Sequence, residues 1–301
     1  MDWRRVFRGV PGVETFASVT LIQKGFADEQ KYLLETAQGE KHLLRVSDIL
    51  RRDEDERVYR IATSAYAAGV PTNEPIAMGL LDDGAHLYRL YRWREGTDAV
   101  AAYHTMDDIE LYKFGHRAGI TLKQIHHVHP QADAKMPIDW TAYYSNRFSD
   151  YVAQIDKHDI HVPGRATIEA FFQNNKPLIG QRASRLYHGD YHCHNFVLGV
   201  NRELSVLDWG ASGYGDPWFD FQGLNNHEIK PAYASGLING YFNDAVPEGF
   251  WPVLALYLTY GALSLVSWAA SLRGQDVGYD PLALCWVTLP RICKHLMACG
   301  G

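Results

Sequence analysis

LYHGDYHCHN, residues 186–195, is the densest polar stretch of this 301-residue chain, and Asp208-Trp209-Gly210 follows thirteen residues after its last position. A short hairpin predicted between Asn195 and Asp208 brings these two residues side by side, because they stand at the open ends of its strands. Amide and carboxylate oxygens are hard ligands that hold Mg²⁺ against nucleotide phosphates, and an aspartate such as Asp190 can accept the proton of a hydroxyl group. The residue types and their spacing therefore favour phosphoryl transfer.

The chain before this stretch predicts a strand-rich region with a single helix. Runs rich in leucine, β-branched and aromatic residues alternate with turns, and one segment changes to helical spacing. The predicted strands are 18–24, 31–36, 41–46, 74–78 and 86–93, and the predicted helix is 48–68. From residue 98 the pattern is mainly helical, with helices expected near 107–128, 139–157, 165–174, 217–227, 232–243, 251–272 and 281–298. The predicted fold class is α+β, with a boundary between two lobes at Gly96.

Composition and charge exclude several classes of protein. With 47% hydrophobic and 21% charged residues and a mean hydropathy of −0.26, the chain is expected to be globular rather than disordered. Its net charge of −6 argues against nucleic-acid binding, which needs a basic face. The four cysteines form no CxxC pair and the first residues contain no apolar signal region, so we expect a cytoplasmic protein.

Residues 251–272 form an uncharged run of 22 residues, which is long enough to span a bilayer. Seven tyrosine, threonine, serine and glycine residues interrupt it, and no cluster of lysine or arginine flanks either end. A helix enclosed by other helices is apolar on all sides, so this run is predicted to be the most buried helix of the larger lobe. We therefore expect no membrane partner and a protein that stays soluble without detergent.

HGDYHCHN with Asp208-Trp209-Gly210 resembles the aminoglycoside phosphotransferase family, the small-molecule branch of the protein-kinase-like fold that also holds choline and fructosamine kinases. The resemblance covers essentially the whole chain. It implies a bilobal fold in which residues 1–95 bind a nucleotide and residues 96–301 form the catalytic and acceptor-binding helical lobe. It also implies Mg²⁺ and ATP or GTP as phosphate donor. A protein kinase is disfavoured, because HRD and DFG motifs are missing from the sequence and Gly215-Asp216-Pro217 follows Asp208 too soon.

The resemblance implies a role for each matching residue. Asp190 becomes the catalytic base, and Asn195 and Asp208 become the magnesium ligands. Arg45 stands where kinases usually place a lysine that grips the α- and β-phosphates, and arginine stays cationic and can bind phosphate oxygens with two nitrogens. The other nucleotide-binding positions implied are the Gly25 turn over the phosphates and the hinge residues Tyr91 and Trp93. The Gly25 turn has an ordinary hairpin turn as its alternative, and a bulky Tyr91 at the back of the pocket would favour GTP.

The resemblance also implies a glutamate partner for Arg45 on the helix that follows it. Glu54 precedes Val58 by four residues and Ile61 by seven, and it therefore shares their inward face, whereas Glu56 is expected to face solvent. The sequence therefore predicts that Glu54 pairs with Arg45.

Several other polar residues are predicted to be structural. Asp216 and Asp220 are expected to cap a helix and brace the catalytic loop rather than contact substrate. His126, His127 and His129 suggest a metal cluster at first sight, but neighbouring helical residues point about 100° apart, and no carboxylate or cysteine completes a site. We expect His126 to be a packing residue at a helix end.

The leading hypothesis is a kinase for a hydroxyl group of a small cationic molecule, most of all an aminoglycoside-type antibiotic. The chain has 20 acidic and 15 basic residues after Gly96, against 15 and 14 before it, and an acidic cleft attracts a polycation. Two alternatives stay open: a metabolic kinase for an amino alcohol, amino sugar or glycated amine, and a catalytically silent nucleotide-binding module in which Arg45 is the disabling change. The candidate acceptor-binding carboxylates are Asp216, Glu228, Asp244, Glu248, Asp276 and Asp280.

Overall fold

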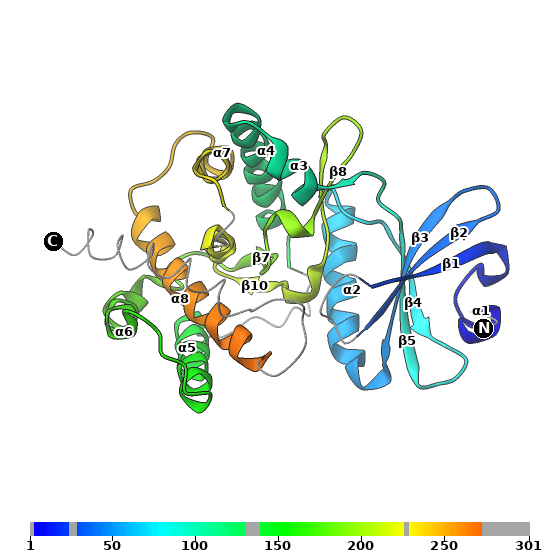
Figure 1. Cartoon of the computed structure of the whole chain (residues 1–301), viewed down its shortest axis with the longest axis horizontal. Coiled ribbons are helices and arrows are strands. Elements are labelled where there is room, and N and C mark those ends of the chain that lie inside the picture. Colours follow the sequence, from blue (N-terminus) through cyan, green and yellow to red (C-terminus); the bar gives the residue numbers. More distant parts are fainter. Residues whose placement is uncertain (1–2, 24–28, 131–138, 226–228, 273–301) are drawn as a thin grey trace. The chain divides into compact units, whose positions relative to one another are not determined.

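The computed structural model describes residues 3–23, 29–130, 139–225 and 229–272, and the chain divides into two compact units. The first unit combines Met1–Ala102 with Cys193–Ser212, and the second combines Tyr103–His192 with Gly213–Gly301. The expected α+β class is confirmed, because the first unit holds an antiparallel sheet with one long helix and the second is mainly helical (Figure 1). The Gly25 turn and the helix expected at 281–298 lie outside the described residues.

A five-stranded antiparallel sheet forms the core of the first unit, with the strand order β1-β2-β3-β5-β4. Its strands are β1 (Phe16–Ile22), β2 (Gln30–Thr36), β3 (Lys41–Asp48), β4 (Pro75–Leu80) and β5 (His86–Arg92). All five expected strands are confirmed, with ends shifted by at most two residues. Leu34 and Leu44 are buried in this sheet beside Phe7, which follows the short helix α1 (Trp3–Val6). This apolar cluster stabilises the sheet that carries Arg45, one of the candidate site residues.

Helix α2 (Arg52–Ala67) follows β3 through a 3₁₀ turn at Ile49–Arg51. The carboxylate of Asp48 caps that turn by accepting a hydrogen bond from the Leu50 N–H group at 2.8 Å. The buried positions recur at helical spacing, and they are Asp55, Val58, Ile61, Ala62 and Ala65. The helix therefore presents one acidic side chain to the interior of the unit.

The hairpin expected between residues 195 and 208 is confirmed as β8 (Phe196–Leu198) and β9 (Leu204–Val206). Its turn contains Arg202 in the left-handed region, with φ 57°. β8 also pairs with β6 (Thr97–Asp98), and the Val206 N–H group donates to the carbonyl of Pro71 at 2.8 Å. These contacts join the hairpin to the first unit, although the sequence boundary at Gly96 assigns it to the second lobe.

Helices build most of the second unit, and α3 (Ala99–Thr105) leads the chain into it. The others are α4 (Asp108–His126), α5 (Trp140–Lys157), α6 (Arg165–Asn175), α7 (Pro231–Phe242) and α8 (Phe250–Ser271). The helix expected at 217–227 is instead a 3₁₀ helix, η6 (Pro217–Asn225). This segment packs closely on the earlier loop that contains Tyr191, because a Cβ atom at Gly223 would lie 2.5 Å from the carbonyl oxygen of Tyr191.

Glycines let α4 and α7 approach each other closely (Figure 1). Gly115 and Gly119 on α4 face Gly236 and Gly240 on α7. A Cβ atom at Gly119 would lie 2.1 Å from the carbonyl oxygen of Leu237, a distance that no real Cβ contact shows. The two backbones therefore touch along a seam that has no room for side chains.

Helix α8 is the most buried of the described helices in the second unit. Of its 22 residues 14 are buried, compared with 9 of 19 in α4 and 6 of 12 in α7. By length and composition alone it is the one described helix that could cross a membrane, but 67% of its most apolar window is buried inside the protein. That burial is typical of a core helix, and among the described helices of the second unit the predicted burial of this run is confirmed.

Candidate active site

The segment His188-Gly189-Asp190 directly follows the short strand β7 (Arg185–Tyr187) in the second unit. β7 pairs with β10 (Gly213–Gly215), and this ribbon fixes where the segment begins. Gly189 has a φ of 83°, a left-handed conformation that residues with a side chain adopt at a cost, so the motif needs glycine here. The Asp190 N–H group lies 3.3 Å from Nδ1 of His188, which helps to fix the turn.

Asp220 braces this turn from η6. Its Oδ2 accepts the His188 N–H group at 2.7 Å, and its Oδ1 accepts the Gly189 N–H group at 2.6 Å. Nε2 of His126 lies 3.0 Å from Oδ2, and Nδ1 of the same ring lies 2.9 Å from the Tyr241 hydroxyl. The predicted bracing role of Asp220 and the packing role of His126 are therefore confirmed. Among the described residues, groups of three or more potential metal ligands of the His, Cys, Asp and Glu types are absent.

Asp190 is accessible, as a base that meets a substrate must be. About half of its side chain is exposed, at 52%. Nε2 of His192 lies 2.8 Å from Asp190 Oδ1, and this histidine is itself 22% exposed. The contact orients one carboxylate oxygen of Asp190. Sequence reasoning missed this function of His192, although its place two residues after Asp190 is a usable signal.

Asp216 is bound within the second unit. It is 1% exposed, and its oxygens accept hydrogen bonds from Arg182 Nε at 2.7 Å and from the Tyr257 hydroxyl at 2.7 Å. It also accepts the Trp218 N–H group at 3.0 Å, which confirms the predicted cap of the following helix. Asp216 is therefore withdrawn as an acceptor-binding candidate. Of the other carboxylates named for that role, Asp244 and Glu248 are exposed, and 228, 276 and 280 lie outside the described residues.

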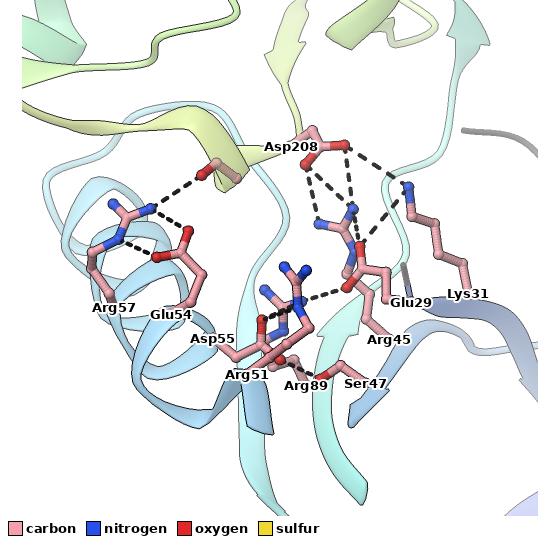
Figure 2. A network of polar contacts seen from close by, with 11 residues as sticks. Glu29, Lys31, Arg45, Ser47, Arg51, Glu54, Asp55, Arg57, Arg89 and Asp208 are labelled. Atoms are coloured by element: carbon pink, nitrogen blue, oxygen red, sulfur yellow. Dashed lines mark hydrogen bonds and ion pairs between the residues drawn. The ribbon is translucent and has the colours of Figure 1, made fainter. Parts of the chain in front are cut away.

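Arg45 contacts two carboxylates in the first unit (Figure 2). Its Nη2 lies 2.7 Å from Oε1 of Glu29 and 3.3 Å from Oδ2 of Asp208. Burial by itself lowers the pKa of Arg45, but the carboxylates of Asp208 and Glu29 outweigh it and raise the pKa. Arg45 and Asp208, which the sequence assigns to phosphate and to magnesium, are thus brought together.

Asp208 has an unusual backbone with φ 63°, in the left-handed region that aspartate tolerates better than most residues. The Leu207 N–H group donates to the carbonyl of Asn195 at 2.8 Å, so the hairpin brings Asn195 next to the Asp208 segment as predicted. The ring N–H of Trp209 donates to the hydroxyl of Thr72 at 3.0 Å and anchors the segment from behind. One carboxylate and one amide suit Mg²⁺, which binds few protein ligands and completes its shell with water and phosphate oxygens.

The prediction that Glu54 pairs with Arg45 is wrong. Its carboxylate binds Arg57, with Oε1 to Nη2 at 2.8 Å and Oε2 to Nε at 3.0 Å, and 46% of its side chain is exposed. Glu54 and Asp55 lie on opposite margins of the buried stripe of α2, so helical spacing alone does not separate them. The sheet decides, because it presents hydrogen-bonding partners to Asp55. Glu56 is exposed, as expected.

Asp55 and Arg89 form the buried ion pair that sequence reasoning missed. Asp55 Oδ1 lies 3.2 Å from Nη2 of Arg89, and both side chains are nearly inaccessible, at 0% and 4%. Asp55 also accepts a hydrogen bond from the Ser47 hydroxyl, and Arg89 also pairs with Glu29. Figure 2 shows these groups converging below Arg45. The signal was the strand register, because Arg89 on β5 stands directly opposite Arg45 on β3.

The expected hinge residues stand at the end of β5, with Tyr91 inside the strand and Trp93 directly after it. Tyr91 is 5% exposed, and burial raises its pKa to about 12, so it is a neutral phenol at physiological pH. The Trp93 N–H group donates to the carbonyl of Lys41 at 3.0 Å. Arg94 Nε donates to the Ser205 hydroxyl at 2.6 Å, and this hydrogen bond ties the hinge to β9. The backbone amide of Trp93 is thus engaged within the unit, and base recognition there would use other groups.

The comparisons with known proteins show the family and the fold. The model of the phosphotransferase enzyme family matches residues 18–256. A choline/ethanolamine kinase family protein from Mesorhizobium loti is 18% identical, with a TM-score of 0.70 over 98% of this chain and 94% of that chain. A spectinomycin phosphotransferase in complex with ADP and spectinomycin is 14% identical, with a TM-score of 0.70 over 98% and 97%.

An aminoglycoside phosphotransferase in a ternary complex with ADP and hygromycin B is 16% identical, with a TM-score of 0.68 over 95% of each chain. None of the curated proteins gives a sequence match. At these identities the solved structures show a shared protein-kinase-like fold.

Proposed function

Because the chain belongs to the phosphotransferase enzyme family, we propose that it transfers the γ-phosphate of ATP or GTP to a hydroxyl group of a small cationic molecule, first of all an aminoglycoside-type antibiotic. The family establishes a phosphotransferase with an alcohol group as acceptor, and the resemblance expected from HGDYHCHN is confirmed. The donor, the metal and the acceptor are the proposed parts. The single observation that carries the proposal is the braced, half-exposed Asp190 of the catalytic loop.

Asp190 acts as the general base in this proposal. Its half-exposed carboxylate accepts the proton of the acceptor hydroxyl as the hydroxyl oxygen attacks phosphorus, and Nε2 of His192 contacts its Oδ1 at 2.8 Å. The brace from Asp220 supports this role, because a base fixed within about 0.5 Å of its working position avoids the cost of ordering during the reaction.

Arg45, Asp208 and Asn195 form the donor side of the proposal. Asn195 and Asp208 hold the magnesium ion, which when bound neutralises charge on the transferring phosphoryl group. Arg45 binds phosphate oxygens with its planar guanidinium. Support comes from their common position in the first unit and from the two cations that already face the Asp208 carboxylate.

A cationic acceptor is favoured by the acidic balance of the chain after Gly96, with 20 acidic and 15 basic residues. Two neighbours of this fold bind spectinomycin and hygromycin B, as their complexes state. The choline/ethanolamine kinase family neighbour favours an amino alcohol as the second candidate acceptor. Both candidates are small molecules that carry a hydroxyl group near a positive charge.

The test is nucleotide consumption by the purified chain with a panel of acceptors. The panel holds spectinomycin, hygromycin B, kanamycin, choline, ethanolamine and an amino sugar, each with ATP and with GTP. We expect acceptor-dependent turnover that Asp190→Asn lowers by about 10²- to 10⁴-fold while nucleotide affinity is retained. Asp156→Asn is the matched control, because this aspartate is exposed on α5 and pairs only at the surface with Arg165.

The panel separates the candidate functions. Turnover with choline or ethanolamine but with no aminoglycoside would establish the metabolic kinase instead. Nucleotide binding without turnover for any acceptor, identical in Asp190→Asn, would contradict the enzymatic proposal and identify a silent nucleotide-binding module. A strong preference for ATP over GTP would remove the GTP expectation drawn from Tyr91.

A further inference from the structure

Three cations stand in a row across the sheet of the first unit. Lys31 on β2 pairs directly with Arg45 on β3, and Arg45 pairs directly with Arg89 on β5. Directly opposite residues of an antiparallel pair point to the same face, so the three side chains share one face of the sheet. Like charges in such positions repel each other, so the row needs anions to hold it.

The row is buried to a degree that is unusual for cations. The side chains of Lys31, Arg45 and Arg89 are 15%, 10% and 4% exposed. Charged side chains of these types are almost never buried unless they are paired. Glu29 binds both arginines, and Asp208 lies near Lys31 and Arg45 (Figure 2).

The carboxylates of the described residues do not satisfy this row completely. The Nε atoms of Arg45 and Arg89 are buried without a hydrogen-bond partner among the described residues. Lys31 Nζ lies 3.9 Å from Asp208 Oδ2 and 4.0 Å from Glu29 Oε1, and both distances are longer than a hydrogen bond. A ligand with several acceptor oxygens, such as a polyphosphate, would supply the missing partners.

Lys31 and Arg89 differ in how firmly they are bound. Arg89 lies between Glu29 and the fully buried Asp55, which fixes its guanidinium in place. Lys31 has two long contacts in the described part of the chain, and its ammonium is carried on a flexible stem. Lys31 is therefore the member of the row that can move to a ligand with the least loss of existing interactions.

We propose that Lys31 is a second phosphate-binding cation of the donor site, alongside Arg45. The inference rests on the proposed function, since it takes a nucleoside triphosphate with magnesium as the ligand. Asp208 exchanges its contacts with Lys31 and Arg45 for the metal ion, and the two released cations bind oxygens of the phosphate chain. Arg89 stays with Asp55 and Glu29 and positions Arg45 through the shared Glu29 carboxylate.

The test is the affinity of the full chain for ATP or GTP, whichever it uses, by isothermal titration calorimetry with magnesium. We expect Lys31→Met to weaken triphosphate binding by about 10- to 100-fold, the effect of losing one hydrogen bond to a charged group. Binding of the corresponding nucleoside, which has no phosphate, should stay unchanged. Lys31→Arg should restore most of the affinity, and with EDTA in place of magnesium the loss should shrink, because Asp208 then keeps its cations.

Lys41→Met is the matched control. It removes a lysine of the same sheet that is not part of the row and whose Nζ pairs with Oε1 of Glu95 at 3.0 Å. Equal triphosphate affinity of Lys31→Met and the unchanged protein would overturn the inference and leave the proposed function standing. Equal loss of nucleoside and triphosphate binding would also overturn it, because that result indicates a structural role. If the unchanged protein binds neither nucleotide, the proposed function fails and the inference fails with it.

Discussion

Neighbouring acidic residues at the start of α2 should differ strongly in their effect on stability. Asp55→Asn removes a charge that is 0% exposed, lies 3.2 Å from Arg89 and accepts a hydrogen bond from Ser47. Removing one partner of a buried ion pair costs about 3–5 kcal/mol, because the other charge stays buried. Glu29 still binds Arg89 in the variant, so we expect the lower end, about 3 kcal/mol.

Glu54→Gln is the matched control at the adjacent position. Its carboxylate is 46% exposed and pairs with Arg57 three residues later, and surface pairs of this kind contribute about 0.2–1 kcal/mol. Urea unfolding of the full chain measures the difference. Hydrogen exchange by mass spectrometry locates it, and the amides of α2 should open about a hundredfold more often in Asp55→Asn. Equal losses in the two variants, or the larger loss in Glu54→Gln, would refute the assignment of Asp55 as the buried partner.

Other predictions concern the packing, the loop brace and pH. Gly119→Ala should lower the unfolding free energy by about 1–3 kcal/mol or more in urea titrations, whereas Gly249→Ala, which has open space, should change it by less than about 0.5 kcal/mol. Asp220→Asn loses one of two accepted N–H groups, so kcat should fall while the nucleotide KM holds in steady-state assays; unchanged kcat would exclude the brace. The hydrogen bond from Arg57 lowers the pKa of Glu54 in the folded protein. Glu54→Gln should therefore cost its full amount of unfolding free energy above about pH 4.3, and this cost should vanish as the pH falls further in acid titrations.

The elements of this fold were largely predictable because their signals are local. Runs rich in leucine, β-branched and aromatic residues between turns predicted β1 to β5, and the hairpin was confirmed near its expected ends. The segment 217–227 was predicted to be a helix like its neighbours in the sequence, yet Pro217–Asn225 forms a 3₁₀ helix. Its contacts are not local, since Asp220 accepts two backbone amides and Gly223 approaches the Tyr191 backbone about thirty residues earlier in the sequence.

Candidate site residues could be named from the sequence where one motif holds them. Asp190, Asn195 and Asp208 follow from residue types at short spacing, whereas Glu54 was chosen from helical spacing that fits Asp55 equally well. The choice between the two depends on Arg89 and Ser47, which stand on the sheet beside α2. Strand register could have shown Arg89 opposite Arg45, but it cannot tell which carboxylate reaches it, because that depends on how α2 packs on the sheet.

The Glu54–Arg57 pair, which forms in place of the expected Glu54–Arg45 pair, also connects α2 to another segment. Besides Glu54, the Arg57 guanidinium donates to the carbonyl of Gly210 at 3.1 Å and to the carbonyl of Ser212. The arginine therefore links α2 to the segment that begins at Asp208. One guanidinium thus ties the sixteen-residue helix to the segment that carries the Asp208 carboxylate, so removing this side chain would release the helix from that segment at both carbonyls.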